Sequence, residues 1–154
     1  MKKLAQQADR YELYEESVQN VEFEVSFYKK MFKRCTNRDA VSLREDFCAS
    51  AKISVEWVKR NASTTSYAVD LDKKVLDYAK NISSNDLTTE QKKRLHLIYG
   101  DSLYYMSPKV DIVSACNFSY WVFKTRDKLK KYFKNTYKCL KKDGLFILDA
   151  FGGY

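Results

Sequence analysis

The sequence predicts an α/β domain with a mostly parallel sheet and right-handed crossovers. Three observations lead to this prediction. Apolar strand-like stretches and amphipathic helical stretches alternate through five rounds, and residues 110–116 are almost continuously apolar, as in a strand buried on both faces. In addition, the expected strands end in polar residues. At 154 residues the chain has room for one domain with a sizeable core. The polar strand ends are Glu45, Asp70, Asp101, Asn117 and Asp149.

The composition is that of a folded, basic protein. Hydrophobic residues make up 45% of the chain and aromatic residues 15%, which excludes a disordered polymer. The formal net charge is +8, and the basic residues are densest between Lys124 and Lys142. We expect most of those lysines to form a solvated helix face. Because a positive charge attracts polyanions without regard to sequence, a nucleic-acid partner stays open.

Cysteine and histidine usage argues against a zinc site. The four cysteines are widely spaced without a Cys-x-x-Cys pair, and His96 is the single histidine. The N-terminus turns polar after its first residues, and no apolar run reaches membrane length. We therefore expect no metal, no membrane partner and a cytoplasmic location. Cys48 is expected to be a small packing residue and His96 to be structural.

Residues 1–36 are expected to form a helical extension, followed by the sheet domain at residues 37–154. Residues 9–17 are charged and aromatic, which is typical of a short helix or an ordered arm. Apolar residues then recur at spacings of four, three and four, which predicts a second helix with one apolar stripe. The stripe consists of Val21, Val25, Tyr28 and Phe32.

The stretch 41–51 organises the predicted domain. An apolar strand over residues 40–43 leads into Glu45 and Asp46, after which small residues open an amphipathic helix. In an open parallel sheet the ligand lies beyond the carboxyl ends of the strands, so this turn is expected to face it. The alternative is a buried strand with a polar exit. The helix carries Ile53, Val55, Trp57 and Val58.

The following units repeat this order. The second strand ends at Asp70-Leu71-Asp72, where Asp72 is a candidate helix N-cap. Gly100 halts the third strand, and the only proline, Pro108, precedes the fourth. The elements are expected at residues 67–69 (strand), 75–82 (helix), 83–89 (loop), 89–93 (helical turn), 95–98 (strand) and 110–116 (strand).

A long helix over residues 125–142 and a fifth strand over residues 145–148 complete the pattern. Gly144 is suited to a left-handed cap at the end of this helix. No internal repeat or low-complexity segment interrupts the alternation. The side of the helix expected to be buried consists of Leu129, Phe133, Thr136 and Leu140.

The polar strand ends define the candidate site. Because parallel strands point the same way, their terminal side chains gather along one edge of the sheet. A carboxylate at a strand end is held rigidly and is well matched to a vicinal diol such as that of a ribose. Small residues in the first turn let the backbone approach a bound cofactor.

These residues resemble the class I S-adenosylmethionine-dependent methyltransferases over roughly residues 40 to 151. In that family an Asp/Glu-x-Gly-x-Gly-x-Gly motif follows the first strand, and its frame falls here on Glu45 through Ala51. A second acid holds the ribose hydroxyls and a third contacts the adenine amine, positions that Asp70 and Asp101 occupy. Together with Arg44-Glu-Asp-Phe-Cys48, Asn117-Phe-Ser-Tyr-Trp121 and Phe151-Gly-Gly-Tyr154, this is similar to a bacterial branch of those enzymes.

The resemblance implies a Rossmann-like sheet flanked by helices, S-adenosylmethionine as the cofactor and methyl transfer to an unknown acceptor. Because aromatic faces attract a sulfonium cation, three tyrosines are also of interest, with ordinary packing as the alternative. They are Tyr11, Tyr14 and Tyr120. The cofactor-binding residues predicted in this way are Tyr11, Tyr14, Arg44, Glu45, Phe47, Ala49, Asp70, Leu71, Asp101, Ser102 and Asn117.

The sequence departs from the family in two places. The three glycine positions hold Phe47, Ala49 and Ala51; alanine is tolerated there where φ is negative, while Phe47 predicts an altered turn. The two strands that follow the fifth in this family are missing, so we expect the domain to be incomplete at its C-terminus. The apolar fifth strand is then an exposed edge, which predicts a truncated chain, a homo-oligomer or a complementing chain.

The segment after the fourth strand is where the family places residues that face the substrate. Asn117 and Tyr120 are the predicted catalytic residues, because the segment resembles the Asp/Asn-Pro-Pro-Tyr/Phe motif of amine-directed methyltransferases. Phe118 and Ser119 replace both prolines, and an amine acceptor therefore remains one option. Methyl transfer needs alignment and exclusion of water rather than a nucleophilic side chain. Asp149 either faces this pocket or caps a strand end.

Several functions remain open at this point. The first is a methyltransferase acting on a small-molecule acceptor, and the second is a non-catalytic or partner-completed remnant of one. Binding or modification of nucleic acid is a third, based on charge alone. A nicotinamide-dependent enzyme also uses an acid after the second strand, but its first turn requires glycines even more strictly.

Overall fold

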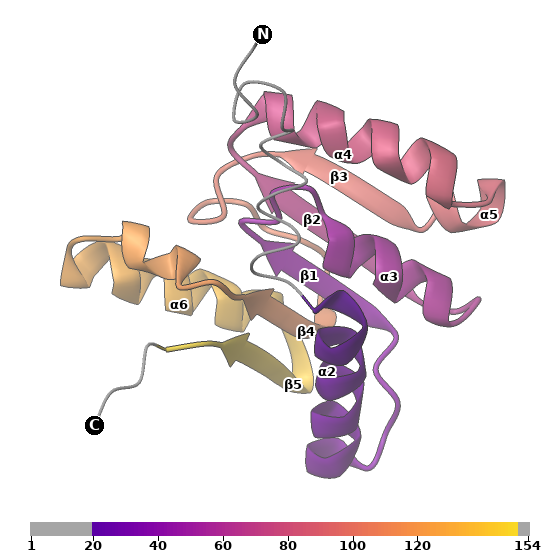
Figure 1. The fold of residues 1–154 in the computed structure, drawn as a ribbon. Coiled ribbons are helices and arrows are strands. Elements are labelled where there is room, and N and C mark those ends of the chain that lie inside the picture. The colour runs from indigo at the N-terminus through magenta and orange to yellow at the C-terminus, as the bar shows by residue number, and fades with distance from the viewer. Residues whose placement is uncertain (1–19, 151–154) are drawn as a thin grey trace, which may run out of the picture.

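The computed structural model describes residues 20–150 of the chain. Five strands form one sheet in the order β3-β2-β1-β4-β5, and all four neighbouring pairs are parallel (Figure 1). The predicted α/β class is confirmed. The elements are α2 (Val21–Thr36), β1 (Ser42–Asp46), α3 (Lys52–Arg60), β2 (Thr65–Asp70), α4 (Lys73–Asp86), α5 (Thr89–Lys92), β3 (Leu95–Tyr99), β4 (Val110–Ala115), the 3-10 helix η2 (Ser119–Val122), α6 (Arg126–Cys139) and β5 (Leu140–Leu148).

Helix α2 has the signals expected for its two ends. The side chain of its N-cap, Asn20, accepts a hydrogen bond from the backbone N–H of Phe23 at 3.2 Å. Acidic residues in the first turn and basic residues in the last complement the helix dipole, and Asn37 closes the helix in the left-handed region. The predicted apolar stripe is buried, because Val25, Tyr28 and Phe32 share a core with residues of β1, α3 and β4.

The two faces of the sheet are covered differently. Leu43 of β1 packs under α2 and α3, while the next residue, Arg44, is buried on the opposite face against α6. Ala68, which is paired with Glu45 across β1 and β2, packs under α4. The helices α2, α3 and α4 therefore cover one face and α6 covers the other, and the strand arrows in Figure 1 all end on the same side of the molecule.

Helix α4 is longer than predicted. It runs to Asp86, so the first part of the expected loop at residues 83–89 is helical. The hydroxyls of Ser83 and Ser84, residues that favour loops in a sequence, donate to the carbonyl of Lys80 inside the helix. The predicted helical turn that follows is confirmed as α5, with a capping box between Thr88 and Gln91.

The predictions for the last helix and the strand after it need correction. Helix α6 ends at Cys139 and β5 begins directly at Leu140. The buried side chains of α6 are Tyr132, Thr136 and Cys139, whereas Phe133 is 37% exposed. The left-handed residue is Asp143 (φ 62°) rather than Gly144. Glycine is needed at residue 144 for another reason, since a Cβ there would lie 3.0 Å from the Lys141 carbonyl and 3.1 Å from the Asp111 carbonyl.

The expected division into an extension of residues 1–36 and a domain of residues 37–154 stays a prediction. Tyr11 and Tyr14 lie outside the described residues. Within residues 20–150, no helix has the length and apolar character needed to cross a membrane.

Candidate functional site

The turn after β1 adopts an unusual backbone conformation at the three positions where the resembling family has glycine. Phe47 (φ 56°), Ala49 (φ 48°) and Ala51 (φ 57°) all lie in the left-handed region. The two alanines therefore do not have the negative φ that we expected of a tolerated alanine. A left-handed residue with a Cβ costs about 1–2 kcal/mol, so the turn keeps this conformation against local strain. The Phe47 ring packs inward, with its centroid 5.9 Å from those of both Phe123 and Tyr132.

Asp70 connects the end of β2 to this turn. Its Oδ2 accepts the backbone N–H of Ala49 at 2.9 Å, and its Oδ1 accepts that of Asp72 at 2.8 Å. The Cys48 N–H also donates to the Val69 carbonyl at 3.0 Å. Asp72 in turn caps α4 through the Lys74 N–H, as predicted. The half-buried Asp70 carboxylate is thus fixed next to the turn by backbone contacts alone.

Glu45 has a different environment, because its side chain lies beneath α3. Its Oε2 accepts the backbone N–H of Ser54 at 3.0 Å and the Ser54 hydroxyl. Ser54 is the third residue of α3, and the N-cap Ala51 has no side-chain oxygen for that N–H. Burial raises the pKa of Glu45 to about 8, although the two bonds from Ser54 act in the opposite direction. The side chain is only 4% exposed.

Arg44 and Asp46 form a buried ion pair on the α6 face. Arg44 Nε lies 2.7 Å from Asp46 Oδ1, and both side chains are fully buried. The same guanidinium donates to the carbonyls of Ser102 at 3.0 Å and Tyr105 at 2.9 Å. The hydroxyl of Tyr132 donates to Asp46 Oδ2 at 2.8 Å. Burial alone lowers the pKa of Arg44, but the Asp46 carboxylate outweighs it and raises that pKa, which keeps the guanidinium charged.

This pair anchors the loop after β3, which carries Asp101 and Ser102. The Asp101 carboxylate accepts the Leu103 N–H at 2.8 Å. The backbone carbonyl of Asp101 accepts the N–H groups of Tyr104 and Tyr105. Ser102 is 3% exposed, whereas Leu71, at the tip of β2, is 59% exposed. The structure therefore places Asp70, Leu71 and Asp101 at the carboxyl edge, with Arg44, Glu45 and Ser102 buried behind it.

The segment after β4 is clamped by Asp149 at the end of β5. The Asp149 carboxylate accepts the backbone N–H groups of Asn117 at 2.6 Å and Phe118 at 2.9 Å. The Tyr120 hydroxyl donates to the Asp149 carbonyl at 3.0 Å. Asn117 (φ 56°) and Phe118 (φ 55°) are both left-handed, which lets their two N–H groups converge on one carboxylate. The structure therefore brings the two predicted catalytic residues, Asn117 and Tyr120, together around Asp149.

For three residues of this site, no local sequence pattern pointed to the contact that the residue makes. Ser54 lies one helical turn beyond the motif, Tyr132 lies 86 residues from its partner Asp46, and Asp149 lies 32 residues from Asn117. Asp149 is a polar strand end, but nothing in the sequence distinguishes a residue that clamps the neighbouring loop from one that faces a pocket. Within residues 20–150, no group of three His, Cys, Asp or Glu side chains is placed to hold a metal ion.

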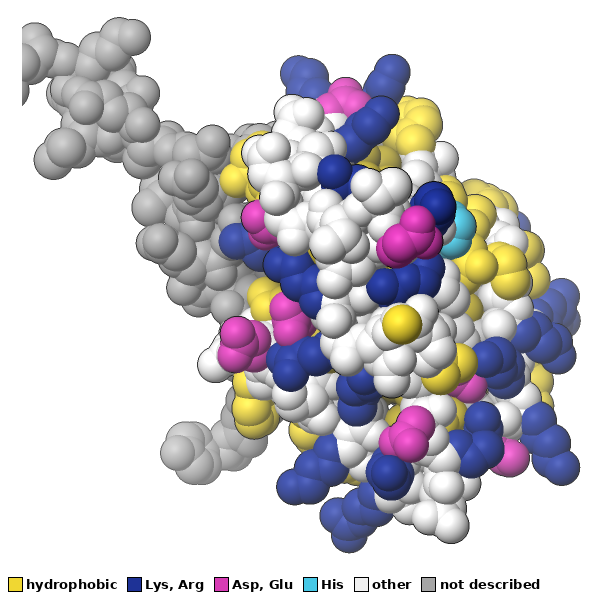
Figure 2. Space-filling view, turned by 90° about the vertical axis from the view of Figure 1, so that its right-hand side faces the viewer, with side chains coloured by type: hydrophobic (Ala, Val, Ile, Leu, Met, Phe, Trp, Pro, Cys, Tyr) yellow, Lys and Arg dark blue, Asp and Glu magenta, His cyan; other side chains and the backbone are white. Residues whose placement is uncertain are grey.

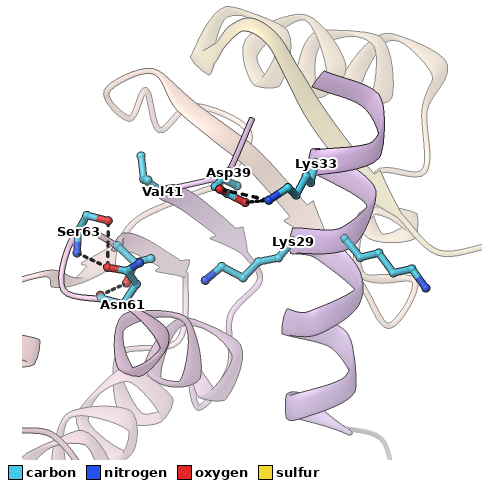
Figure 3. Close-up of a pocket in the computed structure, with 9 residues that line it drawn as sticks. Lys29, Lys33, Asp39, Val41, Asn61 and Ser63 are labelled. Carbon is cyan, nitrogen blue, oxygen red and sulfur yellow. Dashed lines mark hydrogen bonds and ion pairs between the residues drawn. The ribbon is translucent and has the colours of Figure 1, made fainter. Parts of the chain in front are cut away.

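The opposite, amino-terminal edge of the sheet is basic. Figure 2 views the molecule from this side, where many dark blue Lys and Arg side chains lie among white and yellow surface. A cavity of about 770 Å³ here is lined by three lysines of α2 and by the loops before β1 and β2 (Figure 3). Lys33 pairs with Asp39 at 3.1 Å, and Lys29 extends toward the loop of Asn61 and Ser63.

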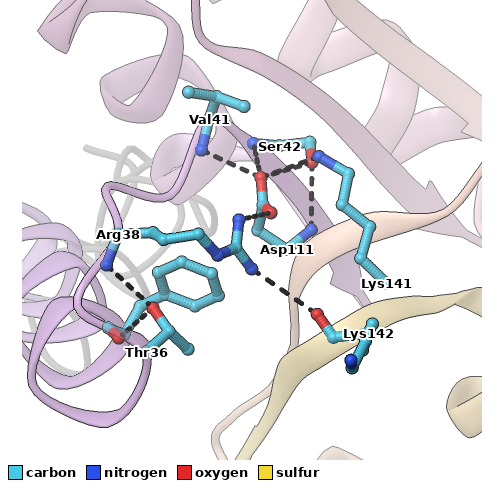
Figure 4. A network of polar contacts seen from close by, with 8 residues as sticks. Thr36, Arg38, Val41, Ser42, Asp111, Lys141 and Lys142 are labelled. Carbon is cyan, nitrogen blue, oxygen red and sulfur yellow. Dashed lines mark hydrogen bonds and ion pairs between the residues drawn. The ribbon is translucent and has the colours of Figure 1, made fainter.

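A second polar network on that edge is structural. Asp111, fully buried at the start of β4, accepts the N–H groups of Val41 and Ser42, both at 3.0 Å, and the Ser42 hydroxyl (Figure 4). Lys141 Nζ lies 3.0 Å from Asp111 Oδ2, and Arg38 Nη1 lies 3.6 Å from Asp111 Oδ1. This network ties β1 to β4 and β5, away from the candidate site.

Comparison with solved structures shows the fold of known enzymes. The chain is similar to an S-adenosylmethionine-dependent methyltransferase from Clostridium acetobutylicum (TM-score 0.71, 22% identity, covering 89% of this chain and 54% of that one). It is also similar to the sugar N-methyltransferase KedS8 from Streptoalloteichus (TM-score 0.73, 15% identity, 93% and 54% covered). The glycopeptide N-methyltransferase MtfA, in complex with S-adenosylmethionine, matches with a TM-score of 0.61 at 14% identity (80% and 53% covered).

At these identities the likeness establishes the fold, and the chain spans about half the length of these enzymes. No curated protein sequence matches the chain. The family described as "Methyltransferase domain" matches residues 46–148, which run from the end of β1 to the end of β5. The chain therefore belongs to the methyltransferase domain family.

Proposed function

We propose that the carboxyl edge of the sheet binds S-adenosylmethionine at Asp70 and the turn after β1, and that the chain serves methyl transfer to a small-molecule acceptor. One observation carries this proposal. The three family glycine positions keep a left-handed backbone without glycine, and the Ala49 N–H of that turn is bonded to Asp70. A strained turn persists when the surrounding structure holds it, and such strain collects at ligand sites.

The residues present fit the cofactor. Each Asp70 oxygen accepts one backbone N–H and retains a lone pair for a second donor, as a ribose diol requires. The Phe47 ring packs against Phe123 and against Tyr132 of α6. Asp101, beyond β3, is the proposed partner of the adenine amine.

Buried residues support these contacts from behind the edge. Arg44 holds the carbonyls of Ser102 and Tyr105, and so fixes the loop on which Asp101 lies. Glu45 fixes the start of α3, where the turn ends. Leu71 is exposed beside Asp70 and is suited to cover an adenine or ribose face. Tyr11 and Tyr14 stay predicted cofactor contacts.

When bound, S-adenosylmethionine supplies an electrophilic methyl group. The chain's own residues then need to align an acceptor and exclude water. Asn117 and Tyr120, fixed by Asp149, are the proposed positioning groups, since an amide oxygen accepts an N–H and an aromatic ring stacks beside it. An amine acceptor fits this arrangement, and two of the similar structures are N-methyltransferases.

Thermal unfolding of the chain with S-adenosylhomocysteine tests the cofactor part of the proposal. A ligand that binds the native state alone raises the Tm, and the shift grows with ligand concentration. We expect such a shift with S-adenosylhomocysteine and none with homocysteine, which lacks the adenosyl group, at equal concentration. Equal Tm values at saturating ligand would refute binding.

A second candidate is a domain completed by another chain. Strand β5 pairs only with β4 in the described sheet, so its other edge offers free backbone groups to a partner strand. We propose a homodimer or a complementing chain at this edge. Light scattering at increasing concentration tests it, and a monomer at all concentrations would remove the homodimer.

The nucleic-acid alternative and the cytoplasmic location stay proposals. The basic face lies at the edge opposite the candidate site, so a polyanion there would dock rather than receive a methyl group. Its binding would weaken steeply with salt, which a titration at two salt concentrations checks. All four cysteines are free thiols, which suits a reducing compartment.

A further inference from the structure

A small cavity lies between α2 and the carboxyl ends of β4 and β5. Its volume is about 200 Å³, and it opens beside Asn117, the predicted catalytic residue. Tyr28 and Phe27 of α2 line one side, and two apolar residues of β5 line the other. The lining residues are Glu24, Phe27, Tyr28, Cys116, Asn117, Ile147, Leu148 and Asp149.

The charge of this cavity is opposite to that of the chain. Among residues 20–150, the charged residues that line it are Glu24 and Asp149, although the net charge of the protein is +8. The Asp149 carboxylate is already engaged by the N–H groups of Asn117 and Phe118. Of the two carboxylates, that of Glu24 is therefore the one available to pair with a ligand. By contrast, the larger cavities at the amino-terminal edge are lined by lysines.

Glu24 lies in the first turn of α2, so its backbone is fixed by the helix. The backbone N–H of Glu24 donates to the Asn20 carbonyl at 2.9 Å, and Tyr28, one helical turn further on, lines the same cavity. Tyr28 is itself fixed by burial and by a 2.9 Å contact between its hydroxyl and Cys116 Sγ. Burial raises the pKa of Glu24, and the Asp149 charge raises it further, so a cation in the cavity would relieve both effects.

We propose that this cavity binds the ammonium group of a small organic amine, with Glu24 as its charge partner and Phe27 and Tyr28 as the walls for an apolar substituent. The aromatic rings add cation–π attraction, and the two β5 side chains exclude water. The amine would then lie beside Asn117. This inference rests on the proposed function, because it identifies the acceptor of the same site as an amine.

Benzylammonium chloride and the uncharged benzyl alcohol are matched probes. We titrate each into the 154-residue chain with saturating S-adenosylhomocysteine and follow backbone amide shifts by NMR. We expect benzylammonium to shift the amides of Asn117 and Phe118 and to bind at least about fivefold more tightly than benzyl alcohol. Glu24→Gln should abolish this preference, and Glu24→Asp should reduce it.

Glu22→Gln is the control, since it removes the same charge from an exposed position in the same turn of α2. It should leave the preference unchanged. Equal affinity for the two probes, or an unchanged preference in Glu24→Gln, would overturn the proposal. Binding of S-adenosylhomocysteine, measured on the same samples, tests the proposed function separately. If the chain does not bind S-adenosylhomocysteine but still prefers benzylammonium, the cofactor site is refuted and the amine cavity stands.

Discussion

Glu45 caps the helix α3, which starts seven residues after it, because its Oε2 accepts the backbone N–H of Ser54 at 3.0 Å. The acid at the end of β1 thereby replaces the side-chain oxygen that the N-cap Ala51 lacks. The left-handed turn between them brings the start of α3 back over β1. Turn and cap thus form one unit that supports the candidate site.

Glu45→Gln should flatten the pH dependence of stability. Because the pKa of Glu45 is raised from about 4.5 to about 8, the folded chain keeps a proton that the unfolded chain loses in this range. Its free energy of unfolding therefore falls as pH rises between these values, by up to about 1.4 kcal/mol per pH unit. Glutamine removes that slope. Urea denaturation at pH 5, 6, 7 and 8 measures it, and parallel curves for both proteins would contradict the assignment.

Glu45→Ala separates the cap from the charge. It removes the acceptor for the Ser54 N–H and should lower the free energy of unfolding by about 1–2 kcal/mol more than Glu45→Gln does at pH 7. Ser54→Ala, which keeps the backbone N–H and loses only the hydroxyl, is the milder control. Equal losses for the alanine and glutamine variants would show that the cap contributes nothing.

Ala49→Gly should stabilise the chain by roughly 0.5–1 kcal/mol. Glycine relieves the left-handed strain of about 1–2 kcal/mol but adds entropy to the unfolded state. Ala62→Gly, in the exposed loop before β2, is the control and should not stabilise, because its φ is not positive. Denaturant midpoints report both changes. A destabilised Ala49→Gly variant would mean that the turn is not strained.

Arg44→Met should be strongly destabilising, by about 3–5 kcal/mol, since it leaves the Asp46 carboxylate buried without its cation. Tyr132→Phe removes only one donor to the same carboxylate and should cost about 1 kcal/mol. Equilibrium urea unfolding compares the two variants. If the two variants lower the free energy of unfolding equally, the ion pair does not hold the loop after β3.

The sequence predicted the sheet and its polar edge because these depend on local patterns. Strand alternation and strand-end residues follow from apolar periodicity, and they placed Asp70 and Asp101 correctly at one edge. The burial of Tyr132 could not be predicted, because the neighbouring Phe133 is the more apolar ring and the hydrogen bond from Tyr132 to the buried Asp46 joins residues far apart in the sequence. The Asp149 clamp likewise depends on how two strands end side by side, which no local pattern encodes.

Calorimetric titration of S-adenosylhomocysteine into Asp70→Asn, Asp72→Asn and the unaltered chain tests the central claim most directly. Asparagine at residue 72 caps α4 as well as aspartate does, so it controls for the loss of one negative charge. We predict binding to the unaltered chain and to Asp72→Asn, and a loss of at least about tenfold in affinity for Asp70→Asn. Equal affinities for all three proteins, or no heat with the folded unaltered chain, would contradict the account.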